Sequence, residues 1–363
     1  MIVSRVCLVG TFPPPLHGMS LINEYVKNRV IASGIPVCVI DTSPRRLSNS
    51  PWIRIWKIVH IFRGILVFCL HSTISKRLPV YMGLSGGGGQ VYDTLFVGIA
   101  RLTGAKLFLH HHSYLYLNRV RRLTRLLLTI AGPKAVHIVS SNNMARDLQG
   151  LYPVVSEVRV ISGIAAIDDW QEPIRQRSEL RTLGFIGNIS KEKGIVEFVE
   201  AAIWADRERP ALRFLLAGPY HSNEARAFVE SKAALTGNMR YVGAVYGDAK
   251  RRFFDEIDVF LFPSHNESDP LVMHEAMSRG VPVIAYYRGC IEQTISDKVG
   301  LGVQPSDAYV EKAKERILLW IDNPAAFRQV SEAATTQFRA ARALHSSNME
   351  SLCGELVNPI SRL

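Results

Sequence analysis

Two glutamates separated by seven residues, Glu267 and Glu275, are the residues of this sequence best placed for chemistry. A carboxylate just before a helix faces whatever binds beyond the helix start. A second carboxylate, about a turn and a half inside that helix, is placed to accept hydrogen bonds from the hydroxyl groups of a ligand. The spacing alone is equally compatible with two solvated surface glutamates, because acidic side chains are seldom buried without a partner.

The residues between the two glutamates predict a helix that positions them. Asp269 is a good N-cap, Pro270 suits the first helical position, and Gly280 is typical of the left-handed residue that follows a helix. We therefore expect a helix from Pro270 to Arg279. The flanking runs "DVFLFP" and "VPVIA" predict strands, so the loop lies at the carboxyl edge of a parallel sheet, where helix N–H groups favour a phosphate.

The rest of the chain repeats this alternation of strand and helix. In the first half, strands are expected at "VCLVG", "VCVI", "PVYMGL", "KLFLH" and "AVHIVS", and helices near residues 18–32, 52–77, 90–102, 117–131 and 142–150. A second series of strands runs through "LGFIG", "LRFLLAG", "MRYVGAV", "DVFLFP", "VPVIAY" and "GLGV". The pattern predicts an α/β protein of two tandem, doubly wound, Rossmann-like domains.

The alternation lapses between residues 163 and 182, where the sequence is polar and has neither the helical nor the strand period. This stretch is the best linker candidate. The expected organisation is an N-terminal domain over residues 1–165, a linker over 166–182, a C-terminal domain over 183–340, and a C-terminal helix over 341–363 that packs back towards the N-terminal domain.

The cysteines and the N-terminus bear on the compartment. The five cysteines are odd in number and scattered, with no C-x-x-C pair, which argues for a reducing compartment and against a zinc site or a disulfide framework. The N-terminus goes straight into an expected strand and shows no secretion signal. We expect a cytoplasmic protein, peripheral on the inner face of the plasma membrane if its basic segments bind lipid.

The net charge of +11 is concentrated in the first half of the chain. Residues 1–175 contain 20 Lys and Arg against 8 Asp and Glu, whereas the remainder contains 23 against 24. Much of the excess lies on two amphipathic segments, 52–77 and 118–132, which is typical of a surface for anionic lipid headgroups. Each segment alone is equally compatible with a helix whose basic face is solvated. The residues that carry the lipid hypothesis are Trp52, Arg54, Ile55, Trp56, Lys57, Ile58, Arg63, Arg121, Arg122, Arg125 and Leu126.

Four landmarks of the second half occur in order: "EKG" after its first strand, "LLAGP" closing the next strand, "FPS", and the glutamate pair. Together they resemble the family-four retaining glycosyltransferases of the GT-B fold, over nearly the whole chain. The resemblance implies transfer of a sugar from a nucleotide-diphosphate donor to a hydroxyl with retention at the anomeric carbon. It also implies a cleft between an acceptor-binding N-terminal domain and a nucleotide-sugar-binding C-terminal domain, and a role in cell-surface polysaccharide synthesis on a lipid-linked or growing glycan.

The resemblance assigns roles to individual residues. Lys193 is expected to hold the donor diphosphate, Glu267 to stand near the departing sugar as an electrostatic or positioning group, and Glu275 to bind the ribose. Asn188 stands where the family has a basic residue, so Lys193 and the helix start carry more of the phosphate charge, or another arginine enters. The expected donor-binding residues are Gly18, Gly187, Asn188, Lys193, Gly218, Pro219, Ser264, Pro270, Leu271, Val272 and Glu275. For Lys193 and Gly18 the competing interpretations are a surface lysine and a simple turn glycine.

Three consecutive histidines end an expected strand of the N-terminal domain. With a period of two, His110 and His112 point to one face of the sheet and His111 to the other. The family carries a histidine here that faces the sugar and the acceptor, and the fit favours His112, with His110 second. The expected catalytic residues are therefore Glu267, His112 and His110. A histidine metal site competes with this interpretation, but no cysteine or carboxylate stands at ligand spacing.

No metal ion or other cofactor is expected. The sequence lacks the Asp-x-Asp triad that carries a divalent ion in the other large glycosyltransferase fold, so Lys193 and oriented backbone dipoles should neutralise the leaving diphosphate. The expected partners are a UDP- or GDP-sugar donor, a glycan or lipid-linked acceptor, and an anionic membrane surface.

Two other function classes stay open. A sugar-nucleotide epimerase of similar architecture could use the same diphosphate cradle, and incubation with the donor alone separates it from a transferase. A nucleic-acid-binding protein would explain the positive charge differently. However, the basic segments lack interleaved exposed aromatic residues and no reader motif is recognisable, so nucleic acid is not expected as a partner.

Overall fold

The computed structural model describes residues 5–14, 17–43, 51–74, 78–167, 170 and 172–357, without the side chains of residues 51–58 and 74. The chain divides into two compact units, one of Met1–Ala166 with Ala343–Leu363 and the other of Ile167–Arg342. Within the described part of the chain, no helix combines the length and the apolar character needed to cross a membrane. Several side chains of the lipid hypothesis lie outside the described residues: Trp52, Arg54, Ile55, Trp56, Lys57 and Ile58.

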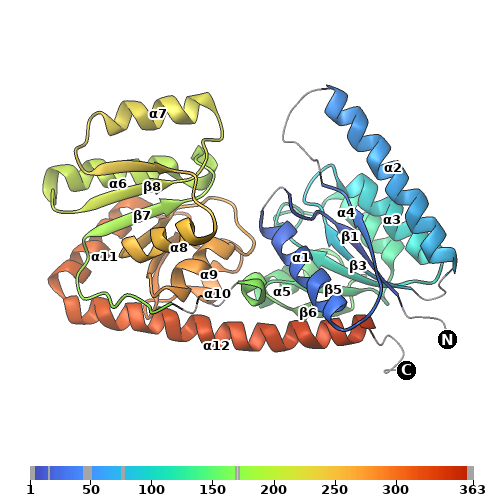
Figure 1. Cartoon of the computed structure of the whole chain (residues 1–363). Helices are drawn as coiled ribbons and strands as arrows, with labels where there is room; N and C mark the ends of the chain where they lie inside the picture. The colour runs from blue at the N-terminus through green and yellow to red at the C-terminus, as the bar shows by residue number, and fades with distance from the viewer. Residues whose placement is uncertain are drawn as a thin grey trace. The chain divides into compact units, whose positions relative to one another are not determined.

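The first unit is a parallel six-stranded sheet with helices on both faces (Figure 1). The strand order is β2-β1-β3-β4-β5-β6. Its strands are β1 (Val6–Gly10), β2 (Val37–Asp41), β3 (Pro79–Leu84), β4 (Lys106–His111), β5 (Val136–Val139) and β6 (Glu157–Val160). Its helices are α1 (Gly18–Ala32), α2 (Pro51–Ile74), α3 (Gln90–Leu102), α4 (Arg122–Ala131), α5 (Asn142–Leu151) and the 3-10 turn η1 (Gly163–Ala166).

Alternation along the central strands builds two cores in this unit. Cys7 and Val9 of β1 pack in the core beneath α2, α3, α4 and α5, whereas Val6 and Leu8 pack in the core on the opposite face. That second core contains α1 and the end of α12 (Pro324–Val357), which contributes Leu352. Because the strands are covered on both faces, they read as nearly continuous apolar runs.

The second unit is also a parallel six-stranded sheet, in the order β12-β11-β10-β7-β8-β9. Its strands are β7 (Thr182–Ile186), β8 (Arg213–Ala217), β9 (Met239–Gly243), β10 (Val259–Phe262), β11 (Val283–Tyr286) and β12 (Gly300–Val303). Its helices are η2 (Lys191–Lys193), α6 (Ile195–Glu208), α7 (Asn223–Ala233), α8 (Gly247–Glu256), α9 (Leu271–Ser278), α10 (Ile291–Thr294), α11 (Tyr309–Asp322) and the first part of α12.

These two sheets confirm the predicted fold class of two doubly wound α/β units. Helices α1, α3 and α5 lie where the sequence predicted them, but α4 begins at Arg122 instead of near residue 117. The residues before Arg122 form turns closed by Asn118 N–H donating to Tyr114 O at 3.0 Å. Strand β6 was not predicted, because its sequence "EVRV" alternates polar and apolar residues over only four positions.

The polar stretch that precedes β7 is counted with the second unit. Arg177 is buried and donates to the carbonyls of Phe254 and Ile257, while Arg279 is buried and donates to Pro173 O at 2.8 Å. A guanidinium has five N–H donors, so it can satisfy several buried carbonyls at once. Arginine hydrogen bonds therefore hold this stretch against the second unit, although it contains few apolar residues.

Candidate functional site

The topological switch point of the second sheet lies between β7 and β10. From β7 the chain proceeds outward to β8 and β9, then returns to place β10 on the other side of β7. The loops that follow β7 and β10 therefore leave the sheet side by side, where doubly wound folds bind their ligands. Lys193 follows β7, and Ser264 and Glu267 follow β10.

Three of the predicted residues meet at this point. Lys193 Nζ lies 2.6 Å from Glu267 Oε1, and the Ser264 hydroxyl donates to the same oxygen at 2.7 Å. Ser264 is buried, the Glu267 side chain is 12% exposed and that of Lys193 is 34% exposed. The ammonium thus keeps a solvent-facing side, while the carboxylate is held in one orientation by two donors.

Backbone geometry fixes the loop that carries Lys193. The Ser190 hydroxyl accepts from Lys193 N–H at 3.2 Å, and Gly194 has φ +84°. A Cβ on Gly194 would stand 2.3 Å from Pro263 O, so only glycine lets this turn approach the end of β10. His265 N–H donates to Glu192 O at 3.0 Å, which joins the two loops directly.

The predicted glycines that follow β7 and β8, Gly187 and Gly218, also lie together. Gly218 has φ +127°, and a Cβ there would stand 1.8 Å from Gly187 O. Ile189 N–H donates to Pro219 O at 2.9 Å, so the two loops continue the sheet beyond its strands. Asn188, between these contacts, is exposed. Because Gly218 has no side chain, the loops after β7 and β8 pack closely together beside the switch point.

The helix that carries the second glutamate starts one residue later than predicted. Pro270 is the N-cap of α9 and Leu271 its first residue, so the prediction that Asp269 caps the helix was wrong. Asp269 Oδ1 is instead engaged by His274 Nε2 at 2.8 Å and by Cys290 Sγ at 3.2 Å. Gly280 follows the helix with φ +68°, as predicted.

Leu271 and Val272 form the first turn of α9, where backbone N–H groups have no partner within a helix. Glu275 lies further along α9 and forms an ion pair with Lys250 of α8. Both side chains are largely buried, with Glu275 14% and Lys250 23% exposed. Sequence reasoning missed Lys250, because it lies in the run "KRR" with no spacing relation to either glutamate.

The histidines of the first unit face as the strand period predicts. The rings of His110 and His112 are 4.0 Å apart between centroids, whereas His111 contacts Tyr116 and His137. His110 is buried and its Nδ1 lies 2.7 Å from the Tyr81 hydroxyl. Burial and then the neighbouring His112 lower the pKa of His110 well below its usual value, so its ring is neutral at pH 7. The role of His112 towards a sugar stays a prediction.

Gly18 begins α1, after the loop that follows β1. The N-cap is His17, whose Nδ1 accepts from Ser20 N–H at 3.2 Å while the Ser20 hydroxyl accepts from His17 N–H at 3.0 Å. A Cβ on Gly18 would meet no atom within 4 Å. The packing of the described residues therefore does not itself require glycine at this exposed helix start.

Residues 166–337 match the model of the family described as glycosyl transferases group 1. The chain is 28% identical over 156 residues to the alpha-galactosylglucosyldiacylglycerol synthase of Streptococcus pneumoniae, covering 41% of this chain and 38% of that protein. It is 28% identical over 138 residues to the capsular polysaccharide biosynthesis glycosyltransferase CapM of Staphylococcus aureus, covering 37% and 36%. The matches thus span well under half of either relative.

A solved structure extends the likeness to the whole chain. The fold is similar to that of Anabaena Alr3699/HepE in complex with UDP, with a TM-score of 0.69 and 13% identity over 99% of this chain and 100% of that one. At this level of identity the likeness concerns the fold alone. The two parallel sheets of this chain are the two domains of a GT-B fold.

Proposed function

We propose that the protein transfers a sugar from a nucleotide-diphosphate donor to a hydroxyl acceptor with retention. The match of residues 166–337 to the group 1 glycosyl transferases supports this proposal and agrees with the resemblance drawn from the sequence. The observation that carries the proposal is the meeting of Lys193, Glu267 and Ser264 at the switch point of the second sheet. This cluster joins an ammonium suited to a diphosphate with an oriented carboxylate suited to a sugar.

The proposed reaction leaves the nucleotide on the second unit. The acceptor oxygen forms a bond to the anomeric carbon while the bond between that carbon and the diphosphate oxygen breaks. The leaving diphosphate takes the proton of the acceptor hydroxyl. Lys193 and the first N–H groups of α9, at Leu271 and Val272, stabilise the developing charge on the diphosphate. When the donor binds, the ion pair between Glu267 and Lys193 opens and the ammonium of Lys193 contacts the diphosphate. The carboxylate of Glu267 then faces the positive charge that develops on the sugar.

We propose a UDP-sugar as the donor and a lipid-linked or growing glycan as the acceptor. The donor rests on the fold shared with HepE, whose structure contains UDP. The acceptor class rests on the names of the two relatives, one a diacylglycerol glycoside synthase and the other an enzyme of capsular polysaccharide biosynthesis. A GDP-sugar remains the second choice of donor.

A donor screen tests this function. The protein should bind UDP in a calorimetric titration and transfer sugar from one UDP-sugar to a glycolipid acceptor, with the anomeric configuration retained in the NMR spectrum of the product. Because Lys193 and the α9 start are proposed to neutralise the diphosphate, the initial rate should be the same with and without added Mg²⁺. A donor isomerised in the absence of any acceptor would point to an epimerase instead.

We also propose that the first unit docks on an anionic membrane. Val59, Phe62, Leu66 and Leu70 are exposed on α2 and recur every three to four residues, so they share one face of the helix. The expectation that the basic segments lack exposed aromatic residues was therefore wrong at Phe62. Arg63 is exposed on the same helix, which contacts α3 (Figure 1). An exposed apolar stripe beside a basic residue is compatible with a helix that lies in the plane of a membrane interface.

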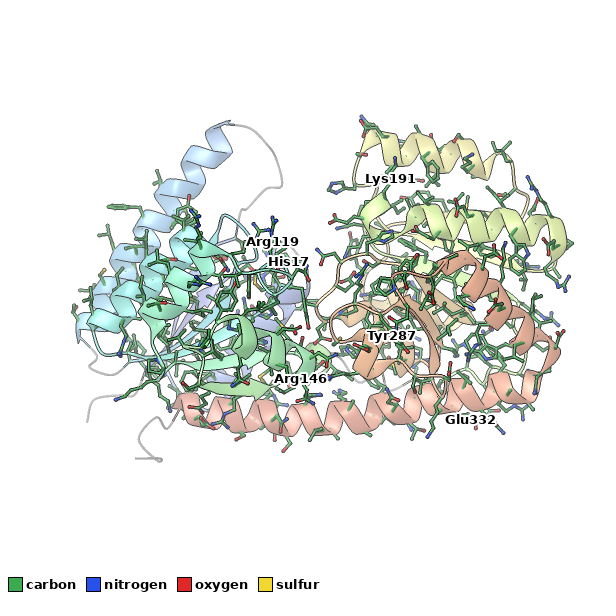
Figure 2. All side chains as sticks on the ribbon, turned by 180° about the vertical axis from the view of Figure 1, so that it is seen from behind. His17, Arg119, Arg146, Lys191, Tyr287 and Glu332 are labelled. Carbon is green, nitrogen blue, oxygen red and sulfur yellow. The ribbon has the colours of Figure 1, made fainter. Side chains whose placement is uncertain are left out.

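The segment before and within α4 adds further positive charge. Arg119, Arg121, Arg122 and Arg125 are all exposed, and Figure 2 marks Arg119 in the loop before α4. Leu126 is exposed beside them. These residues extend the proposed membrane face beyond α2, because α3 packs against both α2 and α4.

Vesicle binding tests this docking. The protein should sediment with vesicles that contain anionic phospholipid, dissociate as salt rises, and ignore zwitterionic vesicles. Replacing Arg121, Arg122 and Arg125 together by Ser should weaken binding at least ~10-fold, because each basic residue near an anionic surface contributes about 1 kcal/mol.

The matched control replaces Arg207, Arg209 and Lys298 by Ser, since these basic residues are exposed on the second unit. This variant should bind vesicles like the wild type. An equal loss in both variants would mean that binding follows total charge, and no binding of the wild type at low salt would favour a soluble acceptor.

A further inference from the structure

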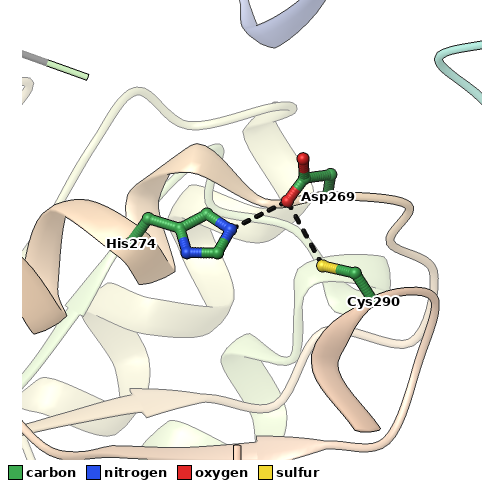
Figure 3. A group of neighbouring side chains, drawn as sticks. All are labelled: Asp269, His274 and Cys290. Carbon is green, nitrogen blue, oxygen red and sulfur yellow. Dashed lines mark hydrogen bonds and ion pairs between the residues drawn. The ribbon is translucent and has the colours of Figure 1, made fainter. Parts of the chain in front are cut away.

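Three metal-ligand side chains converge in the second unit, beside the loop that carries Glu267 (Figure 3). Asp269 precedes α9, His274 lies in its second turn, and Cys290 is the N-cap of α10. One ligand atom from each lies within 4.8 Å of the other two. The side chains of Asp269 and His274 are 6% and 4% exposed, and Cys290 is buried.

Asp269 Oδ1 is the centre of this cluster. It accepts from His274 Nε2 at 2.8 Å and from Cys290 Sγ at 3.2 Å. Burial first, and then the Asp269 carboxylate, raise the pKa of the Cys290 thiol well above its ordinary value. The cluster as it stands is therefore a buried carboxylate satisfied by two proton donors, both of which are also ligand types for a thiophilic cation.

Two of the three separations between ligand atoms are close to those around a tetrahedral ion, and the third, between His274 and Cys290, is within 4.8 Å. Ligand atoms bonded to zinc at about 2.0 to 2.3 Å stand roughly 3.3 to 3.6 Å apart, so the Asp269–His274 and Asp269–Cys290 contacts would open by only about 0.5 Å. Oxygen, imidazole nitrogen and thiolate sulfur together favour Zn²⁺ over Mg²⁺ or Ca²⁺, which take oxygen ligands.

We propose that Asp269, His274 and Cys290 bind one zinc ion, with a water or another outside ligand in the fourth position. Binding releases the proton of the Cys290 thiol to solvent and moves the ring proton of His274 from Nε2 to Nδ1. The sequence predicted no metal, because these ligands are spread along the chain without a recognisable motif. The ion is separate from the neutralisation of the diphosphate, so the proposal does not depend on the proposed function.

The ion would clamp the loop that carries Glu267. Cys290 N–H already donates to Ser268 O at 2.9 Å. A Cβ on Gly289, which has φ +57°, would stand 2.4 Å from Glu267 O, so the loop after β11 packs directly on the Glu267 backbone. A metal bond to Asp269 and Cys290 would join these two loops a second time.

One feature limits the affinity. His274 Nδ1 is buried and has no hydrogen-bond partner among the described residues. A zinc-bound histidine normally donates through its other nitrogen, and here that donor would stay unsatisfied. We therefore expect zinc to exchange more readily than in a closed site with four protein ligands.

Cobalt binding tests the proposal on the full chain after treatment with a chelator. One Co²⁺ per chain should bind with a thiolate-to-cobalt charge-transfer band and visible bands of tetrahedral intensity, and one equivalent of Zn²⁺ should displace it. Zn²⁺ should also raise the melting temperature of the wild type, because a ligand that binds only the folded state stabilises it.

Two variants and a control make the result specific. Cys290→Ser should lose the charge-transfer band, and Asp269→Asn, which keeps the size of the side chain, should lower the affinity for Co²⁺ at least ~10-fold. Cys353→Ser, which removes a buried cysteine of the first unit, should bind like the wild type. Absence of stoichiometric binding by the wild type, or a charge-transfer band that survives in Cys290→Ser, would show that the cluster is a hydrogen-bonded anchor without a metal.

Discussion

Replacing Glu267 by Ala is expected to lower the turnover of glycosyl transfer by about 10²- to 10³-fold, the usual effect of removing one group that stabilises developing charge. The affinity for UDP should stay the same or rise slightly. The reason is the 2.6 Å ion pair between Glu267 and Lys193: without the carboxylate, the whole charge of the ammonium is available to the diphosphate. Turnover is measured with a saturating donor, and UDP affinity by calorimetry.

A conservative variant and a surface control sharpen this test. Glu267→Gln keeps an acceptor for Lys193 and Ser264 but removes the negative charge, so it should resemble Glu267→Ala in turnover if the charge faces the sugar. Glu256→Ala, which removes an exposed carboxylate paired with Arg240, should leave both quantities unchanged. An equal loss of turnover and of UDP affinity in Glu267→Ala would mean that the roles of Glu267 and Glu275 are misassigned.

The fold followed from the sequence wherever burial imposed a pattern. Strands such as β3 and β10 are buried along their whole length, so their apolar runs are long enough to recognise. Local chemistry was less reliable where a tertiary contact competes with it. Asp269 has the side chain of an N-cap, but it lies against His274 and Cys290 instead, and α9 begins one residue later.

The sequence predicted which backbone positions lie at the candidate site, but not which side chains pair with one another there. Gly187, Gly218 and Lys193 follow strand ends, and neighbouring parallel strands bring such positions together. The pairing of Lys193 with Glu267 depends on β10 lying beside β7, which the order of strands along the chain does not reveal. The cluster at Asp269 was missed for the same reason, because Cys290 reaches it only through the β10–β11 neighbour relation.

Glu275→Gln is expected to weaken UDP binding by about 1.5 to 3 kcal/mol, the contribution of a hydrogen bond to a charged group, which corresponds to roughly 10- to 150-fold in the dissociation constant. In the structure Glu275 pairs with Lys250, so the glutamine would also leave that ammonium less well compensated. Lys250→Met separates the two effects: Glu275 keeps its charge there, and the UDP affinity should fall by less than in Glu275→Gln.

The ligand itself supplies the decisive comparison for Glu275. If Glu275 accepts hydrogen bonds from the ribose diol, the wild type should bind UDP more tightly than 2′-deoxy-UDP, because the deoxy ligand leaves the carboxylate a bond short. Glu275→Gln should reduce that preference, since the charge that strengthens the bond is gone. Calorimetric titration of both ligands into both proteins gives the interaction free energy between Glu275 and the ribose 2′-hydroxyl. If the wild type and Glu275→Gln prefer UDP over 2′-deoxy-UDP by the same factor, Glu275 does not bind the ribose and its role is to pair with Lys250.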